Sequence, residues 1–246
     1  MERKYAFIFA FIITILIAAN FYLYKTQFSP NKETVTLSRI IDGDTIQLED
    51  GRKIRLANIN TPEKNFPNYE LAINYLSPYI NKSAELEIIG TEKYGRILAK
   101  IYTPEYLNLE LVKQGLASKF LVEESEIKKF ANAEQEAINS EKGMWKKSEY
   151  FDCLKSEIDK INEKVTILNQ CNKFNILGAI LKDESTKYYK FKESDAETIR
   201  LHSSIGENNA TDIFWNSKTN IWNNDRDTLY IFDKEGNLIH YEIYGY

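Results

Sequence analysis

The longest apolar stretch of the chain lies at its N-terminus. Residues 5–24 carry no charged side chain and directly follow Arg3 and Lys4. A helix of this length spans about 30 Å, the thickness of the hydrocarbon core of a bilayer. The pattern therefore predicts a transmembrane helix at residues 1–25, with its N-terminus in the cytoplasm. Because the run is longer than the apolar part of a cleavable signal peptide, an uncleaved signal anchor is favoured over cleavage and secretion.

The pattern changes after a polar linker at residues 26–33. Short stretches of alternating polar and apolar residues indicate strands, and Asp50-Gly51 is typical of a hairpin turn between two of them. Apolar residues at helical spacing follow, with Pro78 ending or kinking the first helix. The predicted order is three strands, a helix, two strands and two helices, at residues 34–41, 45–48, 53–59, 68–80, 84–89, 97–102, 107–114 and 125–142. This order predicts a small β-barrel with helices packed on it, over residues 34–150.

Beyond Trp145 the composition shifts again. Residues 151–163 are charged, with Leu154, Ile158 and Ile161 as a thin apolar stripe, and the pattern predicts a helical connector. Short strands separated by polar turns follow at residues 164–246 and predict a β-sandwich. The expected fold class is therefore α+β.

Charge and cysteine content narrow the chemistry. The formal net charge is −4, so any binding of phosphate groups has to come from a local site. Cys153 and Cys171 are compatible with one disulfide if the globular part lies outside the cytosol, and equally with two reduced thiols. A zinc site is not supported, because His202 and His240 stand at no ligand spacing.

Oxygen-bearing side chains gather at two predicted strand ends. Asp42 and Asp44 flank a glycine after the first strand, and Asn60, Thr61 and Glu63 follow the third. Hard oxygen ligands of this kind suit calcium, which takes six to eight of them. Taken singly, each motif is more typical of a turn or a helix cap.

Two arginines accompany these oxygen groups. Arg55 lies in the middle of an apolar strand, and Arg96 lies in a turn. Two guanidinium groups can hold a phosphate through paired hydrogen bonds while charge builds on it. A cation, phosphate-binding donors and a carboxylate that orients or deprotonates water are the components that phosphodiester hydrolysis needs.

These motifs occur in a characteristic order: Ile-Asp-Gly-Asp-Thr, Ile-Arg-Leu, Asn-Thr-Pro-Glu and Lys-Tyr-Gly-Arg. In this order and spacing, residues 34–150 resemble the staphylococcal nuclease family. The resemblance implies a five-stranded OB-fold barrel with three helices. It also implies calcium-dependent cleavage of DNA and RNA that leaves 3′-phosphates.

The resemblance assigns a calcium site. Asp44 matches a calcium-ligating carboxylate, Thr61 a residue that ligates through its backbone carbonyl, and Asp42 a nearby acid. The family's second calcium carboxylate is replaced here by Asn60, which offers an oxygen without negative charge, so a lower metal affinity is expected.

The resemblance also assigns catalytic and nucleotide-binding residues. Glu63 matches the general base or water-orienting carboxylate, and Arg55 and Arg96 match the phosphate-binding arginines. Lys93 and Tyr94 are expected in the nucleotide site. Two further tyrosines of the family are replaced by Leu121 and Glu123, which weakens the expected contacts to the nucleotide and leaves the preference for DNA or RNA open.

Residues 164–246 resemble the lamin-tail domain, an immunoglobulin-like β-sandwich. The most specific feature is the Trp-Asn-Asn-x-x-Asp-Thr run that starts at Trp222. The resemblance implies an interaction or tethering module with a protein or surface partner. Trp215 and Trp222 are expected in its core, and Asp225 and Asp227 in a capped turn rather than a calcium loop.

Together these patterns predict a calcium-dependent nuclease, held at the membrane by its N-terminal helix, that acts on DNA or RNA outside the cytoplasm. The alternative is a catalytically weak nuclease-like module that binds nucleic acid or protein, with the C-terminal domain as tether. The oligomeric state is not predicted.

Overall fold

The computed structural model describes residues 2–27, 32–92, 95–171, 174–192 and 196–246. The chain divides into two units, Met1–Glu33 and Thr34–Tyr246, which are described separately. The predicted nucleotide-site residues Lys93 and Tyr94 lie outside the described residues.

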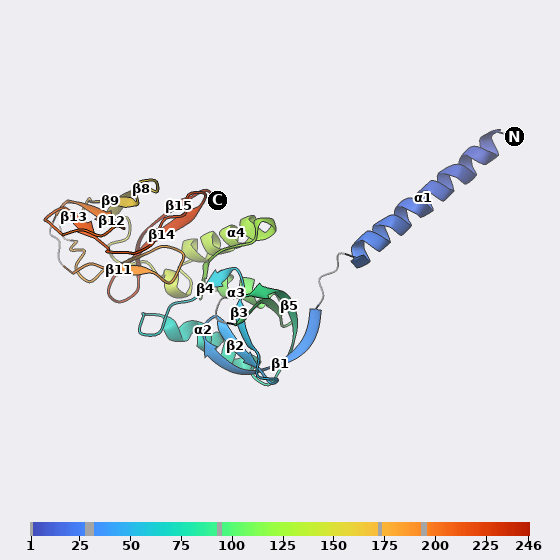
Figure 1. Cartoon of the computed structure of the whole chain (residues 1–246), viewed down its shortest axis with the longest axis horizontal. Coiled ribbons are helices and arrows are strands. Elements are labelled where there is room, and N and C mark those ends of the chain that lie inside the picture. Colours follow the sequence, from blue (N-terminus) through green and yellow to red (C-terminus); the bar gives the residue numbers. More distant parts are fainter. Residues whose placement is uncertain (1, 28–31, 93–94, 172–173, 193–195) are drawn as a thin grey trace. The chain divides into compact units, whose positions relative to one another are not determined.

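The N-terminal unit contains helix α1, Glu2–Gln27 (Figure 1). The apolar stretch thus forms a helix, as predicted. Among the described residues, however, no helix combines the length and the apolar character needed to cross a membrane. The transmembrane span expected at residues 1–25 is therefore not found.

The second unit begins with a closed barrel in the strand order β1-β2-β3-β6-β5. Strands β3 and β6 pair in parallel, and the other neighbours whose register is known pair antiparallel. The five strands are β1 Lys32–Asp42, β2 Thr45–Leu48, β3 Lys53–Leu56, β5 Ser83–Thr91 and β6 Ile97–Tyr102. Alternate residues such as Leu37, Ile46 and Ile54 point into the barrel and are fully buried. The predicted barrel is confirmed, and its form fits the OB-fold.

Short helices and one small ribbon surround the barrel. Pro78 lies where α2 gives way to a single 3₁₀ turn, because proline cannot continue the hydrogen bonding of an α-helix. These elements are α2 Tyr69–Leu76, η1 Ser77–Tyr79, α3 Leu107–Lys113, η2 Glu124–Glu126, α4 Ile127–Asn139, η3 Gly143–Trp145, and β4 Ile59–Asn60 paired with β7 Ser118–Lys119. The barrel and these elements, residues 34–150, are called the barrel domain below.

Residues 154–246, called the C-terminal domain below, form two four-stranded sheets in the orders β11-β10-β14-β15 and β13-β12-β9-β8. Both sheets contribute to one hydrophobic core, in which Trp222 is buried and Trp215 packs at the edge, as predicted. The strands are β8 Leu154–Asp159, β9 Lys164–Asn169, β10 Ile180–Lys182, β11 Tyr188–Lys190, β12 Thr198–His202, β13 Asp212–Phe214, β14 Asp227–Phe232 and β15 Leu238–Tyr244.

The prediction of a helical connector at residues 151–163 is wrong. Strand β8 lies there and pairs antiparallel with β9. Leu154 and Ile158 are four residues apart, which places them on one face of a strand as well as on one face of a helix. Ile161 completes the helical stripe in the sequence, but in the structure it is 84% exposed in the turn before β9.

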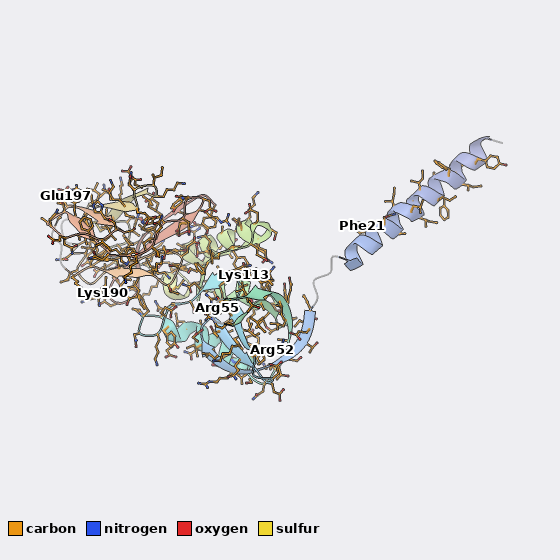
Figure 2. All side chains as sticks on the ribbon, viewed as in Figure 1. Phe21, Arg52, Arg55, Lys113, Lys190 and Glu197 are labelled. Atoms are coloured by element: carbon orange, nitrogen blue, oxygen red, sulfur yellow. A yellow bond between two sulfur atoms is a disulfide. The ribbon has the colours of Figure 1, made fainter. Side chains whose placement is uncertain are left out.

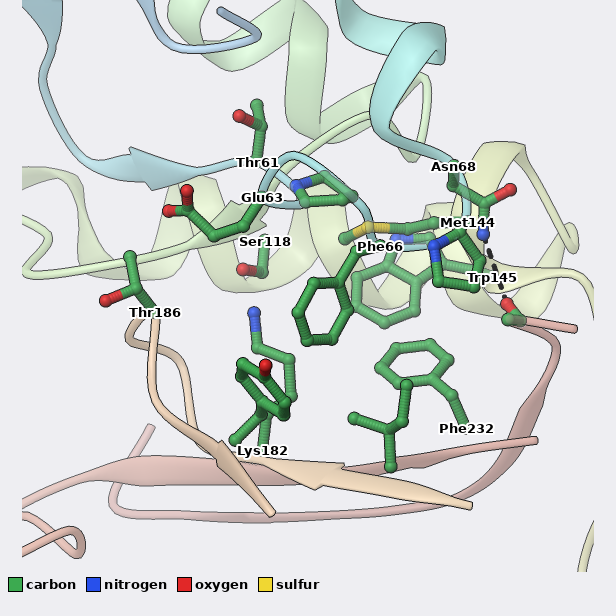
Figure 3. Close-up of a pocket in the computed structure, with 15 residues that line it drawn as sticks. Thr61, Glu63, Phe66, Asn68, Ser118, Met144, Trp145, Lys182, Thr186 and Phe232 are labelled. Carbon is green, nitrogen blue, oxygen red and sulfur yellow. Dashed lines mark hydrogen bonds between the residues drawn. The ribbon is translucent and has the colours of Figure 1, made fainter. Parts of the chain in front are cut away.

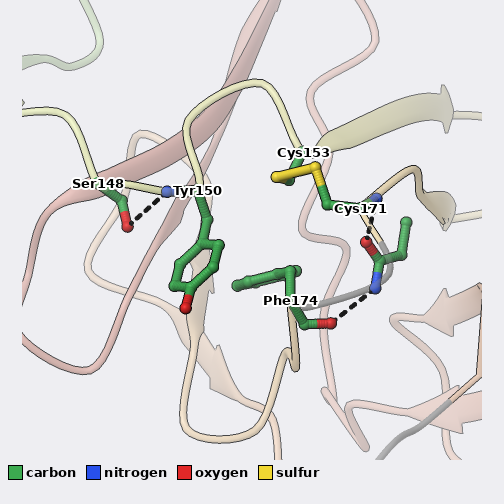
Figure 4. Close-up of a disulfide and its surroundings, with 6 residues drawn as sticks. Ser148, Tyr150, Cys153, Cys171 and Phe174 are labelled. Atoms are coloured by element: carbon green, nitrogen blue, oxygen red, sulfur yellow. Dashed lines mark hydrogen bonds between the residues drawn. A yellow bond between two sulfur atoms is a disulfide. The ribbon is translucent and has the colours of Figure 1, made fainter.

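Cys153 and Cys171 form a disulfide (Figure 4). The bond joins the residue before β8 to the segment after β9, so it closes the end of that strand pair. The rings of Tyr150 and Phe174 pack beside it, with their centroids 5.1 Å apart. Of the two states that the sequence leaves open for these cysteines, the structure has the bonded one.

The two domains meet across a buried apolar cluster. Trp145 of the barrel domain is fully buried and packs against two rings on β14, Tyr230 at 5.1 Å and Phe232 at 6.0 Å between centroids. Ile138 and Leu238 belong to the same cluster. The C-terminal domain is therefore packed onto the barrel domain through shared core residues.

A buried ion network lies within this interface. Lys119 of β7 is completely buried, and its Nζ atom lies 2.6 Å from Glu134 on α4 and 2.8 Å from Glu184 in the β10–β11 loop. The same amine donates to the Thr228 hydroxyl at 2.6 Å, and the Tyr230 hydroxyl donates to Glu134 at 2.9 Å. Burial alone would lower the pKa of Lys119, but the two carboxylates raise it, so the amine stays charged.

Replacing Lys119 with methionine is expected to lower the free energy of unfolding by about 3–5 kcal/mol, because Glu134 and Glu184 would stay buried without their cation. Urea denaturation of the full chain measures this change. Lys128→Met is the matched control, since Lys128 is exposed on α4. Equal stability of the two variants would show that the buried cation is not needed.

The side chain of Asp227 caps the polar turn before β14. Its carboxylate accepts hydrogen bonds from the backbone N–H of Thr228 at 2.8 Å and of Asn223 at 3.0 Å, as expected for a capped turn. Burial, and to a smaller extent the negative charge of Glu184, raise the pKa of Asp227 from 3.8 to about 7. The folded chain therefore holds a proton here that the unfolded chain releases near pH 4.

The contribution of Asp227 to stability is expected to fall as the pH rises from about 4 to about 7, and to stay level above that. Asp227→Asn carries no such proton. The unfolding free energy of the unchanged chain, minus that of Asp227→Asn, should decrease across this window in urea titrations between pH 4 and 8. A constant difference over the whole range would contradict the assignment.

Candidate active site

The turn between β1 and β2 places two carboxylates at one end of the barrel. Asp42 accepts a hydrogen bond from the backbone N–H of Asp44 at 3.1 Å, which fixes the turn. Asp44 is 7% exposed, and its Oδ2 atom accepts hydrogen bonds from the N–H and the hydroxyl of Thr61, at 3.1 and 3.2 Å. The two strand ends that the sequence singled out are thus joined through Asp44 and Thr61.

Arg55 of β3 lies next to this pair and is 6% exposed. Its Nε atom is 3.2 Å from the Oδ1 atom of Asp44. Its two terminal nitrogens donate to the carbonyl of Leu56 at 2.6 Å and to the side-chain oxygen of Asn60 at 3.3 Å. These contacts hold the guanidinium group of Arg55 in one orientation beside the carboxylate.

Arg96 and Glu63 are more accessible than Arg55. Arg96 pairs with Glu92 at 2.6 Å and donates to the Thr45 hydroxyl at 3.2 Å. Glu63 is exposed, and within the described part of the chain no hydrogen bond or ion pair reaches its carboxylate. The carboxylate of Glu63 is therefore free to bind a water molecule.

All these groups line one cleft with a volume of about 380 Å³. Every described residue that the sequence assigns to the site lies on its wall: Asp42, Asp44, Arg55, Asn60, Thr61, Glu63 and Arg96. Carboxylate, guanidinium and amide groups lie on its wall, which suits a charged ligand.

The cleft also has walls that the sequence did not predict. Phe120 lines it, whereas the family resemblance pointed in that segment only to Leu121 and Glu123, as replacements of two tyrosines. Glu123 instead pairs with Lys100 at 2.5 Å. The aromatic side chain of Phe120 was itself the signal in the sequence, since nucleic-acid sites often contain rings that stack on bases.

Ser185 and Thr186 form a further part of the wall, and they come from the β10–β11 loop of the C-terminal domain. The side-chain nitrogen of Asn60 donates to the backbone carbonyl of Glu184 in the same loop, at 3.3 Å. Asn60 thus contacts Arg55 with its oxygen and the C-terminal domain with its nitrogen. Nothing in the sequence pattern connects residues so far apart.

The electrostatics of the cleft fit a cation. Burial raises the pKa of Asp44 to about 6; Arg55 lowers it, and the nearby charge of Asp42 raises it further. The negative charge at Asp44 is therefore only partly compensated by Arg55, and a bound cation would stabilise it. The available donors are hard oxygens of the kind that calcium takes. No group of three or more His, Cys, Asp or Glu residues that could hold a metal occurs within the described ranges, so amide and carbonyl oxygens would have to complete the shell.

Comparisons with known proteins identify the family of this chain. A family model described as "Staphylococcal nuclease homologue" matches residues 53–147. A thermonuclease of Staphylococcus hyicus is 32% identical over 130 residues, which cover 47% of this chain and 77% of the thermonuclease. The chain belongs to the staphylococcal nuclease family. The residues that the family model matches all lie within the barrel domain.

Other relatives carry endonuclease names. An uncharacterized endonuclease of Escherichia coli is 34% identical over 85 residues, or 32% of this chain and 56% of that protein. Endonuclease YncB of Bacillus subtilis is 34% identical over 138 residues, or 47% of this chain and 63% of that protein. The chain thus spans little more than half the length of the Escherichia coli relative.

The turn at Gly43 gives a test of the site geometry in the barrel domain. A Cβ atom at Gly43 would lie 2.6 Å from the hydroxyl of Thr61 and 2.9 Å from the Cβ of Ala72. Gly43→Ala is therefore expected to lower the free energy of unfolding by about 1–3 kcal/mol and to displace Thr61 from Asp44. Gly90→Ala is the matched control, because a Cβ there meets no atom within 4 Å. Thermal denaturation compares the two, and an unchanged Gly43→Ala protein would contradict the predicted crowding.

Proposed function

We propose that this protein is a calcium-dependent nuclease that hydrolyses phosphodiester bonds in DNA or RNA. The observation that carries the proposal is the single cleft in which Arg55, Arg96 and Glu63 face the oxygen donors of the β1–β2 turn. A site that only bound phosphate would have no need for an exposed, unpaired carboxylate beside its arginines. Family membership and the endonuclease names of the relatives support the same activity.

The proposed reaction begins with a water molecule held by Glu63. Its oxygen attacks the phosphorus atom, and its proton passes to the Glu63 carboxylate. The bond from phosphorus to one ester oxygen breaks, and that oxygen takes a proton from solvent. Arg55 and Arg96 hold the remaining phosphoryl oxygens and stabilise the charge that builds on them.

Calcium would be held by the carboxylate of Asp44, the side-chain oxygen of Asn60 and the backbone carbonyl of Thr61, with Asp42 adding negative charge nearby. A bound calcium ion supplies positive charge that polarises a phosphoryl oxygen. Because Asn60 contributes no charge, weak calcium binding is expected, with a dissociation constant on the order of millimolar rather than micromolar.

We further propose that the protein acts outside the cytoplasm. The disulfide between Cys153 and Cys171 supports this location, because such bonds form and persist in oxidising compartments. The resemblance of residues 164–246 to the lamin-tail domain, and a tethering role for that domain, remain predictions.

A binding module without catalysis is the competing function. Two observations favour it: Asp44 is already paired with Arg55, and Asn60, which stands where the family has a charged ligand, already accepts a hydrogen bond from Arg55. Cleavage assays separate the two functions, since a binding module would retain nucleic acid without cutting it.

The full chain is expected to cut single-stranded DNA, double-stranded DNA or RNA in calcium and to stop cutting in chelator. Glu63→Gln is expected to lower the rate constant of cleavage by about 10²–10⁴-fold, since it removes the proton acceptor. Glu70→Gln is the matched control, because Glu70 is exposed on α2 outside the cleft wall. Binding without cutting at every calcium concentration would establish the binding module instead.

A further inference from the structure

Lys182 is the last residue of β10, and its side chain points out of the C-terminal sheet toward the barrel domain. Figure 3 shows its amine directed toward Ser118, with Glu63 and Thr186 to one side. The amine lies in a cavity of about 40 Å³ between the two domains, whose wall also includes Phe66. Part of the Lys182 side chain remains exposed.

The Lys182 amine has no partner for its charge. Throughout the described residues, no hydrogen bond or ion pair reaches it. Burial lowers the pKa of Lys182, while the carboxylates of Asp183 and Glu63 raise it from beyond ion-pair distance. The Lys182 amine is not among the buried side-chain atoms that lack a partner, so it keeps some access to solvent. An anion that enters from the cleft can therefore pair with it.

The cavity of Lys182 adjoins the active-site cleft. Four residues line both spaces: Thr61, Pro62, Glu63 and Thr186. The cavity therefore opens beside Glu63 on the wall of the cleft. A volume of about 40 Å³ holds a few water molecules and excludes a nucleobase, so the chemistry on offer is a charge contact rather than base recognition.

The loop that follows Lys182 is held firmly against the barrel domain. The carboxylate of Glu184 is bound by Lys119 at 2.8 Å and by the hydroxyl of Tyr246 at 2.6 Å. The backbone carbonyl of Glu184 accepts a hydrogen bond from Asn60. Lys182 is thus presented to the cleft by a fixed support, which is what a substrate contact requires.

We propose that the C-terminal domain forms one wall of the nucleic-acid cleft, and that Lys182 contacts a backbone phosphate next to the scissile one. This inference rests on the proposed nuclease function. It makes Lys182 a substrate-binding residue supplied by the second domain, with Thr186 beside it as a hydroxyl that has no hydrogen-bond partner among the described residues.

The test measures how salt weakens binding of a fluorescent single-stranded oligodeoxythymidine. The full chain carrying Glu63→Gln is used in calcium, so that the probe stays intact. Each phosphate neutralised by a lysine contributes about −0.7 to the slope of the logarithm of the binding constant against the logarithm of the salt concentration. Adding Lys182→Met is expected to make the slope less negative by about this amount, and Lys182→Arg is expected to restore it.

Lys190→Met is the matched control. Lys190 is exposed on the neighbouring strand β11 (Figure 2). It lines neither the cavity nor the cleft. Lys190→Met therefore removes the same charge from the same hairpin and is expected to leave the slope unchanged. An effect of equal size in both variants would show a general charge effect and overturn the contact. An unchanged slope in Lys182→Met would also overturn it, and urea denaturation of each variant shows that the folded protein was compared.

Cleavage by the unchanged chain, measured in parallel, keeps the two proposals apart. If the chain cuts DNA in calcium but the Lys182→Met slope is unchanged, the nuclease stands and the Lys182 contact fails. If the chain binds DNA without cutting it and the slope changes as expected, the contact stands and the nuclease fails.

Discussion

The arrangement of the barrel domain and the C-terminal domain depends on the ion pairs of the buried Lys119 amine. This amine is the cation shared by Glu134 of the barrel domain and Glu184 of the C-terminal domain. Two carboxylates could not be buried side by side without it, because burial raises the pKa of Glu184 and the second negative charge raises it further. The apolar packing of Trp145 against β14 holds the domains together without specifying a position, whereas this network fixes one register between them.

That register determines the shape of the active-site cleft. Glu184 lies between Lys182 and Thr186 in the chain, so fixing its carboxylate also fixes the loop that forms the cleft wall. Asn60 joins the two systems, because one side chain contacts both Arg55 and the backbone of Glu184. An aspartate at position 60 would place a carboxylate oxygen against the carbonyl oxygen of Glu184. Both atoms are acceptors, so the hydrogen bond that Asn60 donates would be lost. The amide of Asn60 is therefore suited to the docked domain, and a lower charge at the proposed calcium site accompanies that contact.

The barrel was predictable from the sequence, and so was the gathering of oxygen donors and arginines at one cleft, because their signals are local. Alternating strands, a glycine between two aspartates and an arginine within an apolar strand each reflect constraints that act within a few residues. Strand β8 was mistaken for a helix because an apolar spacing of four fits both periods in a short segment. Ser185, Thr186 and Lys182 could not be assigned to the site at all, since more than a hundred residues separate them from Glu63 and only the packing of two domains brings them together.

The docked C-terminal domain distinguishes this protein from one that consists of the barrel domain alone. A tether needs only a linker and a free binding surface, and it gains nothing from a buried ion network against the barrel domain. Here Glu184, Thr228 and Tyr230 all direct polar atoms into the interface, where each is hydrogen-bonded. Such a fully satisfied network makes the interface specific. This network fixes the β10–β11 loop, whose residues Ser185 and Thr186 line the cleft. The docking of the second domain and the proposed reaction therefore depend on the same set of contacts.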